Sequence, residues 1–219
     1  MTLDQFLQQH PRLTRSLKKF IDDYQAQLAP ETFVAFLNNL SEELNKYAAA
    51  FSQISTNEER ARRLHQWVEE EISQGANIPV SCHKGCSACC HMEVEVTSYE
   101  VEILARLVQS GHEIDRDRLV RQSSRNLQDA SWKQGPRNPD SKCVFLNAEG
   151  SCSIYEHRPV MCRRHSVTSP AANCDTLDAP ITLRYFPRVD LLISAANEDQ
   201  NMQIGPLAKM LELSLHSSL

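Results

Sequence analysis

The sequence has little glycine, no long apolar run and no excess of positive charge. Only six of its 219 residues are glycine and 23% are charged, so neither a low-complexity nor a disordered chain is expected. The net charge of −5 gives no reason to expect binding to nucleic acid or to an anionic membrane surface. No stretch approaches the roughly 20 apolar residues of a membrane-spanning helix. We therefore expect neither a nucleic-acid partner nor a membrane segment.

The first residues also lack the features of a secretory leader. Polar residues, among them Asp4, Gln8 and His10, interrupt the apolar ones, and no small-residue cleavage site follows. We therefore expect a cytoplasmic protein, where grouped cysteines indicate metal binding or catalysis more often than structural disulfides. No Ser-His-Asp set, pair of catalytic carboxylates or phosphate-binding loop stands out, so the sequence leaves open whether the protein is an enzyme.

Residues 1–75 contain no cysteine and have helical periodicity. Apolar residues recur every three or four positions from about 12 to 28, from 30 to 51 and from 56 to 75. Pro30 fits the first position of the second helix. Thr56 and Glu59 form a capping-box pattern that opens the third. The sequence predicts a mainly α fold that begins with an antiparallel helical bundle.

The rest of the chain predicts a mixture of short helices and loops. A short strand is expected at 92–96, a helix after the capping-box pattern of Thr97 and Glu100, and another from 115 to about 130 with Leu119, Val120 and Leu127 inward. Prolines and glycines predict a loop-rich stretch from 131 to 180. We expect an N-terminal helical segment at 1–75, a cysteine-cluster metal-binding domain at 76–180, and a helical tail at 181–219 that packs on the rest, its last helix starting near Pro206.

The eight cysteines all fall between residues 76 and 180, in two groups. The first group is dense and consists of Cys82, Cys86, Cys89 and Cys90, whereas the second is widely spaced and consists of Cys143, Cys152, Cys162 and Cys174. A loop-rich stretch buries little backbone, and metal crosslinks can replace a hydrophobic core because ligation stabilises the folded state directly. We therefore expect all eight thiols to be metal ligands.

Spacing within the first group indicates how its sulfurs are presented. Cys86 and Cys89 form a Cys-x-x-Cys pair that can aim two sulfurs at one centre, and Cys82 precedes Cys86 by four residues. Gly85 supplies the permissive backbone of a tight ligand loop. The side chains of adjacent residues diverge, so we expect Cys89 and Cys90 to face different centres, or one to bind metal while the other packs.

The identity of the metal stays open at this level. Eight thiols supply two sites of four thiolates each, or one four-iron cluster with four thiols to spare. Zinc and iron–sulfur clusters both accept soft thiolates, so ligand softness does not separate them. His83, His91, His157 and His165 are candidate substitutes, with His165 favoured by its position three residues after Cys162. A disulfide framework is the remaining alternative, and the absence of a leader disfavours it.

Several segments resemble a known family. They are Cys82 to Cys90, Cys143-Val-Phe-Leu, the run from Gly150 to Arg163 with its Cys-x-Ile-Tyr-x-x-Arg-Pro-x-x-Cys-Arg pattern, and Cys174-Asp175. Over about residues 80–176 the sequence resembles the CxxCxxCC, or YkgJ-like, cysteine-cluster proteins, described as a zinc- or iron-chelating domain. The gap between Cys82 and Cys86 is one residue longer than the family name implies. The resemblance implies an iron–sulfur cluster or zinc as the cofactor.

Three functions follow as hypotheses. The first is a metal-binding protein whose centre is structural or carries electrons, with a protein redox partner. The second is an iron–sulfur-dependent redox or methyl-transfer enzyme, since members of the family are often labelled iron–sulfur oxidoreductases and a related domain occurs in flagellin lysine methylases. The third is a metal carrier or sensor in which Cys89 and Cys90 exchange ligands with a partner.

Basic and aromatic residues near Cys162 allow two interpretations. A guanidinium from Arg158 or Arg163 beside thiolates would offset their negative charge and lower their pKa. Alternatively, Arg158 and Pro159 start a helical turn that aims Cys162, with Tyr155 packed beneath that turn.

Overall fold

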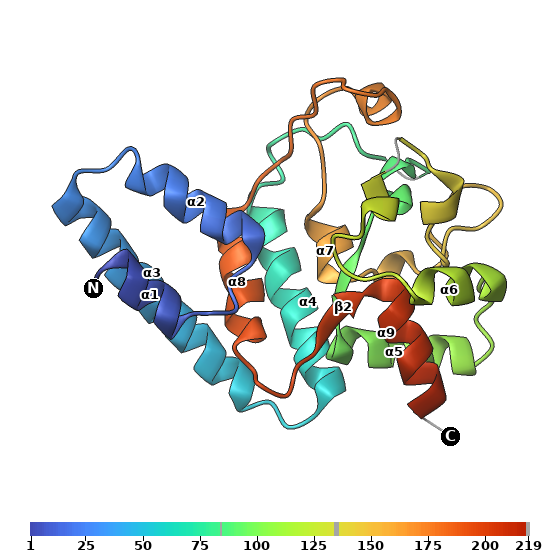
Figure 1. Ribbon diagram of the computed structural model, residues 1–219, viewed down its shortest axis with the longest axis horizontal. Coiled ribbons are helices and arrows are strands. Elements are labelled where there is room, and N and C mark those ends of the chain that lie inside the picture. Colours follow the sequence, from blue (N-terminus) through green and yellow to red (C-terminus); the bar gives the residue numbers. More distant parts are fainter. Residues whose placement is uncertain (84, 134–135, 218–219) are drawn as a thin grey trace. The chain divides into compact units, whose positions relative to one another are not determined.

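The computed structural model describes residues 1–83, 85–133 and 136–217, and the chain forms two compact units (Figure 1). The helical unit comprises Met1–Gln74 and Tyr185–Met202, and the cysteine unit comprises Gly75–Arg184 and Gln203–Leu219. The expected mainly α fold is confirmed, since the described chain is mostly helical with a single two-stranded sheet. The three-segment division stays a prediction, and the structure adds that residues of the last segment occur in both units. Among the described residues, no helix combines the length and the apolar character that a membrane span needs.

The helical unit contains the three helices predicted from periodicity. Its elements are α1 (Leu3–Gln9), α2 (Arg15–Gln25), α3 (Pro30–Ser52), α4 (Asn57–Gln74) and α8 (Pro187–Asn197). Pro30 occupies the first turn of α3, as expected. The capping box before α4 also forms, with the Glu59 backbone N–H donating to Thr56 Oγ1 at 3.2 Å and the Thr56 N–H donating to Glu59 Oε2 at 3.3 Å.

Helix α1 was not predicted, although the sequence carries a start signal for it. Thr2 caps this helix: the Gln5 N–H donates to Thr2 Oγ1, and the Thr2 N–H donates to Gln5 Oε1 at 2.8 Å. The Ser/Thr-x-x-Glu/Gln pattern is therefore present at 2–5. The helix is short and buries one large side chain, Phe6, so its periodicity is too weak to detect alone.

Helix α8 supplies the centre of the helical unit, where it contacts α2, α3 and α4. All nine residues from Val189 to Asn197 are buried, which is the pattern of a helix covered on every side. Its polar residues are satisfied inside the core. Thr14 donates its hydroxyl to Asp190 Oδ1 at 2.9 Å, and the Thr14 N–H donates to Ser194 Oγ at 2.9 Å. The predicted bundle of residues 1–75 thus needs a helix from the tail to complete its core.

Buried His10 and half-buried Glu198 form a pair of titratable groups at the end of α8. His10 Nδ1 and Glu198 Oε1 are 3.8 Å apart, and neither atom has a hydrogen-bond partner among the described residues. His10 Nε2 lies 2.8 Å from Ser41 Oγ. Burial raises the pKa of Glu198 and lowers the pKa of His10, because desolvation disfavours both charged forms.

Replacing Glu198 with Gln is therefore expected to raise the free energy of unfolding of the helical unit by about 1 kcal/mol at pH 7. Folded Glu198 holds its proton to a higher pH than the unfolded carboxyl, whose pKa is 4.5, so wild-type stability falls as the pH rises through the raised value. The neutral amide avoids this loss, and its advantage should disappear near pH 4. Urea unfolding of the full chain at both pH values measures the effect, and an equal gain at both would contradict the explanation.

The cysteine unit is built on a small sheet and three helices that share a core. Strand β1 (Glu95–Thr97) pairs antiparallel with β2 (Ile204–Pro206), with Val96 opposite Gly205. Helices α5 (Ser98–Gln109) and α9 (Leu207–Ser217) follow directly on these strands, and α9 packs on α5 and on α6 (Arg116–Ser123). The buried residues at the centre include Leu104, Phe145 and Leu211. The strand lies slightly later than predicted, and the last helix begins one residue after Pro206.

Helix α6 is shorter than predicted, and part of its assigned inner face is wrong. It ends at Ser123 instead of about residue 130, and the chain turns at Gln128, where φ is +64°. Leu119 is buried as expected, but the side chain of Val120 is 61% exposed. The two are neighbours on a helix and point about 100° apart, so a helix of two turns buries only one of them.

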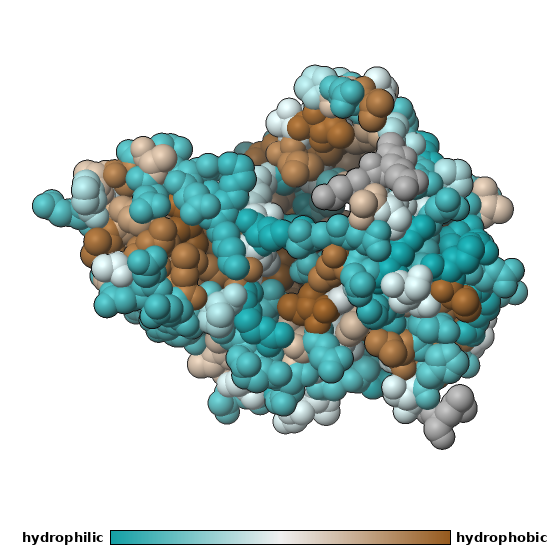
Figure 2. All heavy atoms as spheres, viewed as in Figure 1, coloured by the Kyte–Doolittle hydropathy of each residue, from teal (hydrophilic) through white to brown (hydrophobic). Residues whose placement is uncertain are grey.

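Between 131 and 180 the chain is loop-rich, as predicted. The only α-helix in the described part of this stretch is α7 (Val160–Arg164), accompanied by short 3₁₀ turns. These turns include η3 (Pro139–Ser141), η4 (Tyr155–His157) and η5 (Ala171–Asp175), and a further 3₁₀ turn, η1 (Ala88–His91), lies earlier in the cysteine unit. In Figure 2 an apolar patch lies over the loop that Figure 1 draws in orange, where Leu177, Ile181 and Leu183 are exposed.

Candidate metal centre

The thiols of the cysteine unit gather around one cavity of about 240 Å³. All eight cysteines lie in the described part of the chain, and all are free thiols. Seven of them line the cavity: Cys82, Cys86, Cys89, Cys90, Cys143, Cys152 and Cys162. The eighth, Cys174, lies in η5. Within residues 1–83, 85–133 and 136–217, no three His, Cys, Asp or Glu side chains are placed to hold one metal ion together.

The adjacent thiols of Cys89 and Cys90 both face this cavity. They lie in η1, where the Cys90 N–H donates to the Ser87 carbonyl at 2.9 Å, and their side chains are hydrogen-bonded to each other. The expectation that the two side chains diverge is wrong. In this tight 3₁₀ turn the two sulfurs approach each other closely enough for one thiol to donate to the other.

A hairpin-like turn places Cys143 next to Cys152. Leu146 and Cys152 form an antiparallel bridge, and the turn closes with the Gly150 N–H donating to the Asn147 carbonyl at 3.2 Å. Gly150 has φ of +73°, which glycine adopts without strain. The Cys143 N–H donates to the Cys90 carbonyl at 2.7 Å. This bond joins the dense cysteine group directly to the widely spaced one.

Cys162 is positioned by α7, and α7 is held by a buried carboxylate. Glu100 is 2% exposed, and its Oε1 accepts the Val160 backbone N–H at 2.8 Å. Its Oε2 accepts the Thr97 N–H at 3.1 Å, so the same side chain completes the predicted capping box of α5. Pro159 is the N-cap of α7, as expected for the turn that carries Cys162, whereas Arg158 is the C-cap of the preceding turn Tyr155–His157.

Backbone N–H groups donate to three of the sulfurs. The Val167 N–H lies 3.4 Å from Cys82 Sγ, the Phe145 N–H donates to Cys143, and the Ile154 N–H donates to Cys152. Such bonds favour the thiolate over the thiol. Hydrogen bonds of this kind around ligand atoms are a regular part of metal sites and tune the metal they surround.

Crowding and burial oppose ionisation of these thiols. Burial raises the pKa of Cys143 to about 11, and it also raises the pKa of Cys162. The pKa of Cys90 is raised, first because its S–H donates to Cys89. The same bond lowers the pKa of Cys89 to about 7, with help from Arg158 and Arg137. A bound cation would stabilise the thiolates that the site otherwise disfavours, and metal binding is then coupled to proton release.

The arginines near Cys162 have different roles. Arg158 lines the cavity, and its charge interacts favourably with Cys89, Cys152 and Cys162. Its guanidinium carbon lies 3.7 Å from the ring centroid of Tyr155, which is 49% exposed. Tyr155 is thus not packed beneath the turn of Cys162, because it covers Arg158 at the surface. Arg163 donates through Nε to the Arg158 carbonyl at 2.6 Å and so shapes the loop before α7.

Among the candidate histidines, His83 and His165 line the cavity. His91 places Nδ1 3.1 Å from the Ser87 carbonyl, and His157 ends η4. Burial lowers the pKa of His165, so it is neutral, the form in which imidazole binds metal. His165 therefore stays the favoured substitute ligand.

Sequence reasoning missed two residues that organise the site. Arg137 contacts Ser87 and Asp175 across 50 and 38 residues of chain, and no periodicity or motif links these positions. Glu100 was recognised as a helix cap, but its bond to Val160 depends on tertiary contact over 60 residues. Neither contact has a local sequence signal.

The donor set suits a soft metal, because thiolates bind zinc and iron–sulfur clusters. No curated protein and no solved structure matches the chain. Residues 81–182 match the model of the CxxCxxCC family, whose description reads "Putative zinc- or iron-chelating domain", and the match contains all eight cysteines. The resemblance seen in the sequence is thereby confirmed over residues 81–182, which make up just under half of the chain.

Proposed function

We propose that the cysteine unit holds an iron–sulfur centre in the thiol-lined cavity, where it crosslinks the surrounding segments and carries electrons. The observation behind this proposal is the lining of seven thiols around about 240 Å³. A structural zinc ion takes four ligands at about 2.0–2.3 Å from one point, which uses fewer thiols and less space. An iron–sulfur cluster is larger and is held by cysteine thiolates at its periphery.

Four thiols form the best ligand set for one cluster. Cys89, Cys143, Cys152 and Cys162 all line the cavity, and every pair of them interacts electrostatically, which supports this choice. They come from η1, the hairpin-like turn and α7, so a cluster bound to them would join three separate segments. Cys82, Cys86 and Cys174 remain proposed as ligands in a second thiol group, and Cys90, which lies within electrostatic range of Cys89, Cys143 and Cys152, remains proposed as a ligand beside the first.

This chain's own residues would adapt the site to electron transfer. Arg158 offsets negative charge beside three of the four proposed ligands. The N–H groups of Phe145 and Ile154 donate to two of them, and hydrogen bonds to ligand sulfurs tune the reduction potential of such clusters. A bound cluster would supply one-electron chemistry, and a protein redox partner would then be required.

Anaerobic purification followed by optical spectroscopy and elemental analysis tests the proposal. We expect a brown protein with broad visible absorption that bleaches on reduction, containing iron and acid-labile sulfide. Cys89→Ser should lose the colour, whereas Arg116→Gln, a control at an exposed arginine of the same unit outside both thiol groups, should retain it. A colourless wild-type protein with stoichiometric zinc would overturn the iron–sulfur assignment and leave a structural zinc site.

A further inference from the structure

Arg137 joins two segments that each carry a cysteine of the second thiol group. Its Nη1 donates to Ser87 Oγ at 2.8 Å, next to η1. Its Nε and Nη2 donate to the two carboxylate oxygens of Asp175, the second at 3.1 Å. Ser87 directly follows Cys86, and Asp175 directly follows Cys174. One guanidinium therefore holds the neighbours of Cys86 and Cys174 together, and η1 and η5 are in contact.

The electrostatic interactions of Arg137 agree with its hydrogen bonds. Arg137 interacts favourably with Cys86 and Cys90, while Cys174 lies within electrostatic range of Cys86 and Cys82. The carboxylate of Asp175 would by itself repel thiolates so close to it. Pairing with Arg137 neutralises that charge, so the acidic residue can lie beside the thiols.

Cys174 needs such a tether because its segment is a loop tip. The base of the loop is paired, with a bridge between Val167 and Leu183 and a bond from the Thr168 N–H to the Thr182 carbonyl at 2.9 Å. Inside the tip, Asn173 Nδ2 donates to the Pro180 carbonyl at 2.8 Å. These bonds organise the loop internally. The Arg137–Asp175 pair ties its tip to the first cysteine segment.

We propose that Arg137 is a positioning residue of the metal centre, which docks Cys174 beside Cys82 and Cys86 by clasping Asp175. This inference rests on the proposed function, because it assumes that the thiols bind metal. The bidentate pairing uses the planar fork of arginine, and lysine offers only a single charged group. Arg137→Lys should therefore rescue the position of Cys174 only in part.

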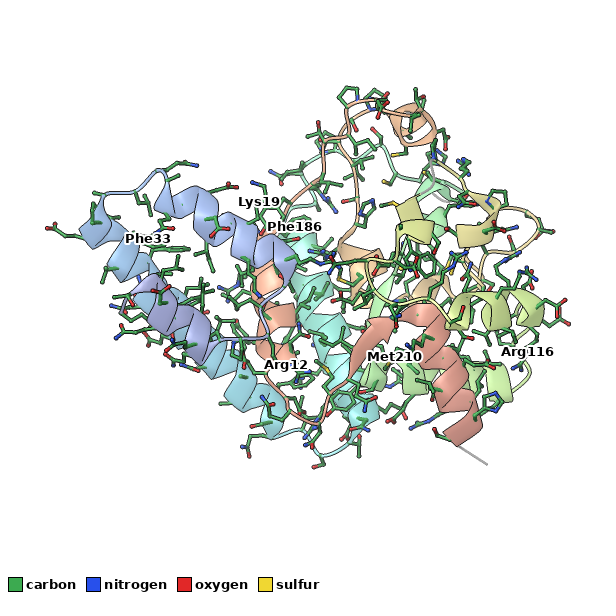
Figure 3. All side chains as sticks on the ribbon, in the orientation of Figure 1. Arg12, Lys19, Phe33, Arg116, Phe186 and Met210 are labelled. Carbon is green, nitrogen blue, oxygen red and sulfur yellow. The ribbon has the colours of Figure 1, made fainter. Side chains whose placement is uncertain are left out.

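The experiment measures, by mass spectrometry, how fast each cysteine of the anaerobically purified full-length protein is alkylated by iodoacetamide. Arg137→Gln and Asp175→Asn are compared with wild type. Arg116→Gln is the matched control, since Arg116 is an exposed arginine of the same unit, at the start of α6 (Figure 3). We expect Cys174 to react about five- to tenfold faster in both site variants, with Cys143 and Cys162 still protected. In the double variant Arg137→Gln/Asp175→Asn, Cys174 should react no faster than in either single variant, because both changes break the same contact.

Two outcomes would overturn the inference: unchanged Cys174 alkylation in both site variants, or wild-type Cys174 reacting as fast as in urea-unfolded protein. Should Arg137→Gln fail to fold, Asp175→Asn and Arg137→Lys make the same comparison. Metal content, measured on the same samples, separates this inference from the proposed function. If wild type contains metal but the alkylation rate of Cys174 is unchanged in the variants, only the proposed positioning role of Arg137 is contradicted. Faster alkylation of Cys174 in variants of a metal-free protein contradicts only the metal centre.

Discussion

Removing the metal with a chelator under reducing conditions is expected to unfold the cysteine unit and leave the helical unit folded. Between 131 and 180 the described chain contains one α-helix of five residues, so thiol–metal bonds would hold together segments with little secondary structure. For scale, metal binding contributes about 10–16 kcal/mol in structural zinc sites. That is comparable to the whole stability of a domain, about 5–15 kcal/mol.

Hydrogen–deuterium exchange before and after chelation measures this effect segment by segment. Amides around Cys89, Cys143 and Cys162 should lose protection together, and restoring the metal anaerobically should return it. The helical unit serves as the internal control, because its core is formed by apolar side chains such as Phe6, Leu37 and Leu64. Uniform loss of protection in both units, or none in either, would contradict the two-part account.

Replacing Glu100 with Gln is expected to lower the free energy of unfolding by about 3 kcal/mol and to expose Cys162 to alkylation. Both carboxylate oxygens of Glu100 accept backbone N–H groups, from Val160 and from Thr97. The amide of Gln offers one acceptor oxygen, so at least one buried N–H loses its partner. Because Val160 begins α7, the loss would loosen the helix that carries Cys162.

Glu102→Gln is the matched control for this change. Glu102 lies on the same helix, where its partly exposed side chain pairs with Arg106 at 3.7 Å, and such a surface pair contributes little. Urea unfolding of the metal-bound protein should shift for Glu100→Gln and stay within about 0.5 kcal/mol of wild type for Glu102→Gln. Equal effects of the two substitutions would show that Glu100 acts only as a surface charge.

Local sequence signals were sufficient to predict most helices. They failed where the position or length of a helix depends on tertiary packing. Pro30 and the capping boxes at Thr56 and Thr97 mark helix starts correctly, because these effects act within one turn. The central position of α8 in the helical unit could not be predicted, because its burial depends on segments more than 100 residues away. The inward assignment of Val120 failed because periodicity cannot show where a short helix stops.

For the candidate site, the sequence predicted the residue types better than their arrangement. The two groups of cysteines and the turn before Cys162 follow from spacing and local chemistry. The contact between Cys89 and Cys90 depends on side-chain conformation, and the Cys90–Cys143 backbone bond on long-range folding. Arg137 illustrates the same limit, since its partners Ser87 and Asp175 lie on either side of it in the chain.

Native mass spectrometry of the anaerobically purified protein tests the central claim most directly. The iron–sulfur account predicts a species heavier than the 24.9 kDa chain by the mass of an iron–sulfide cluster, which is lost when the protein is unfolded in acid. A native mass equal to the chain alone, or to the chain plus zinc ions, would contradict it.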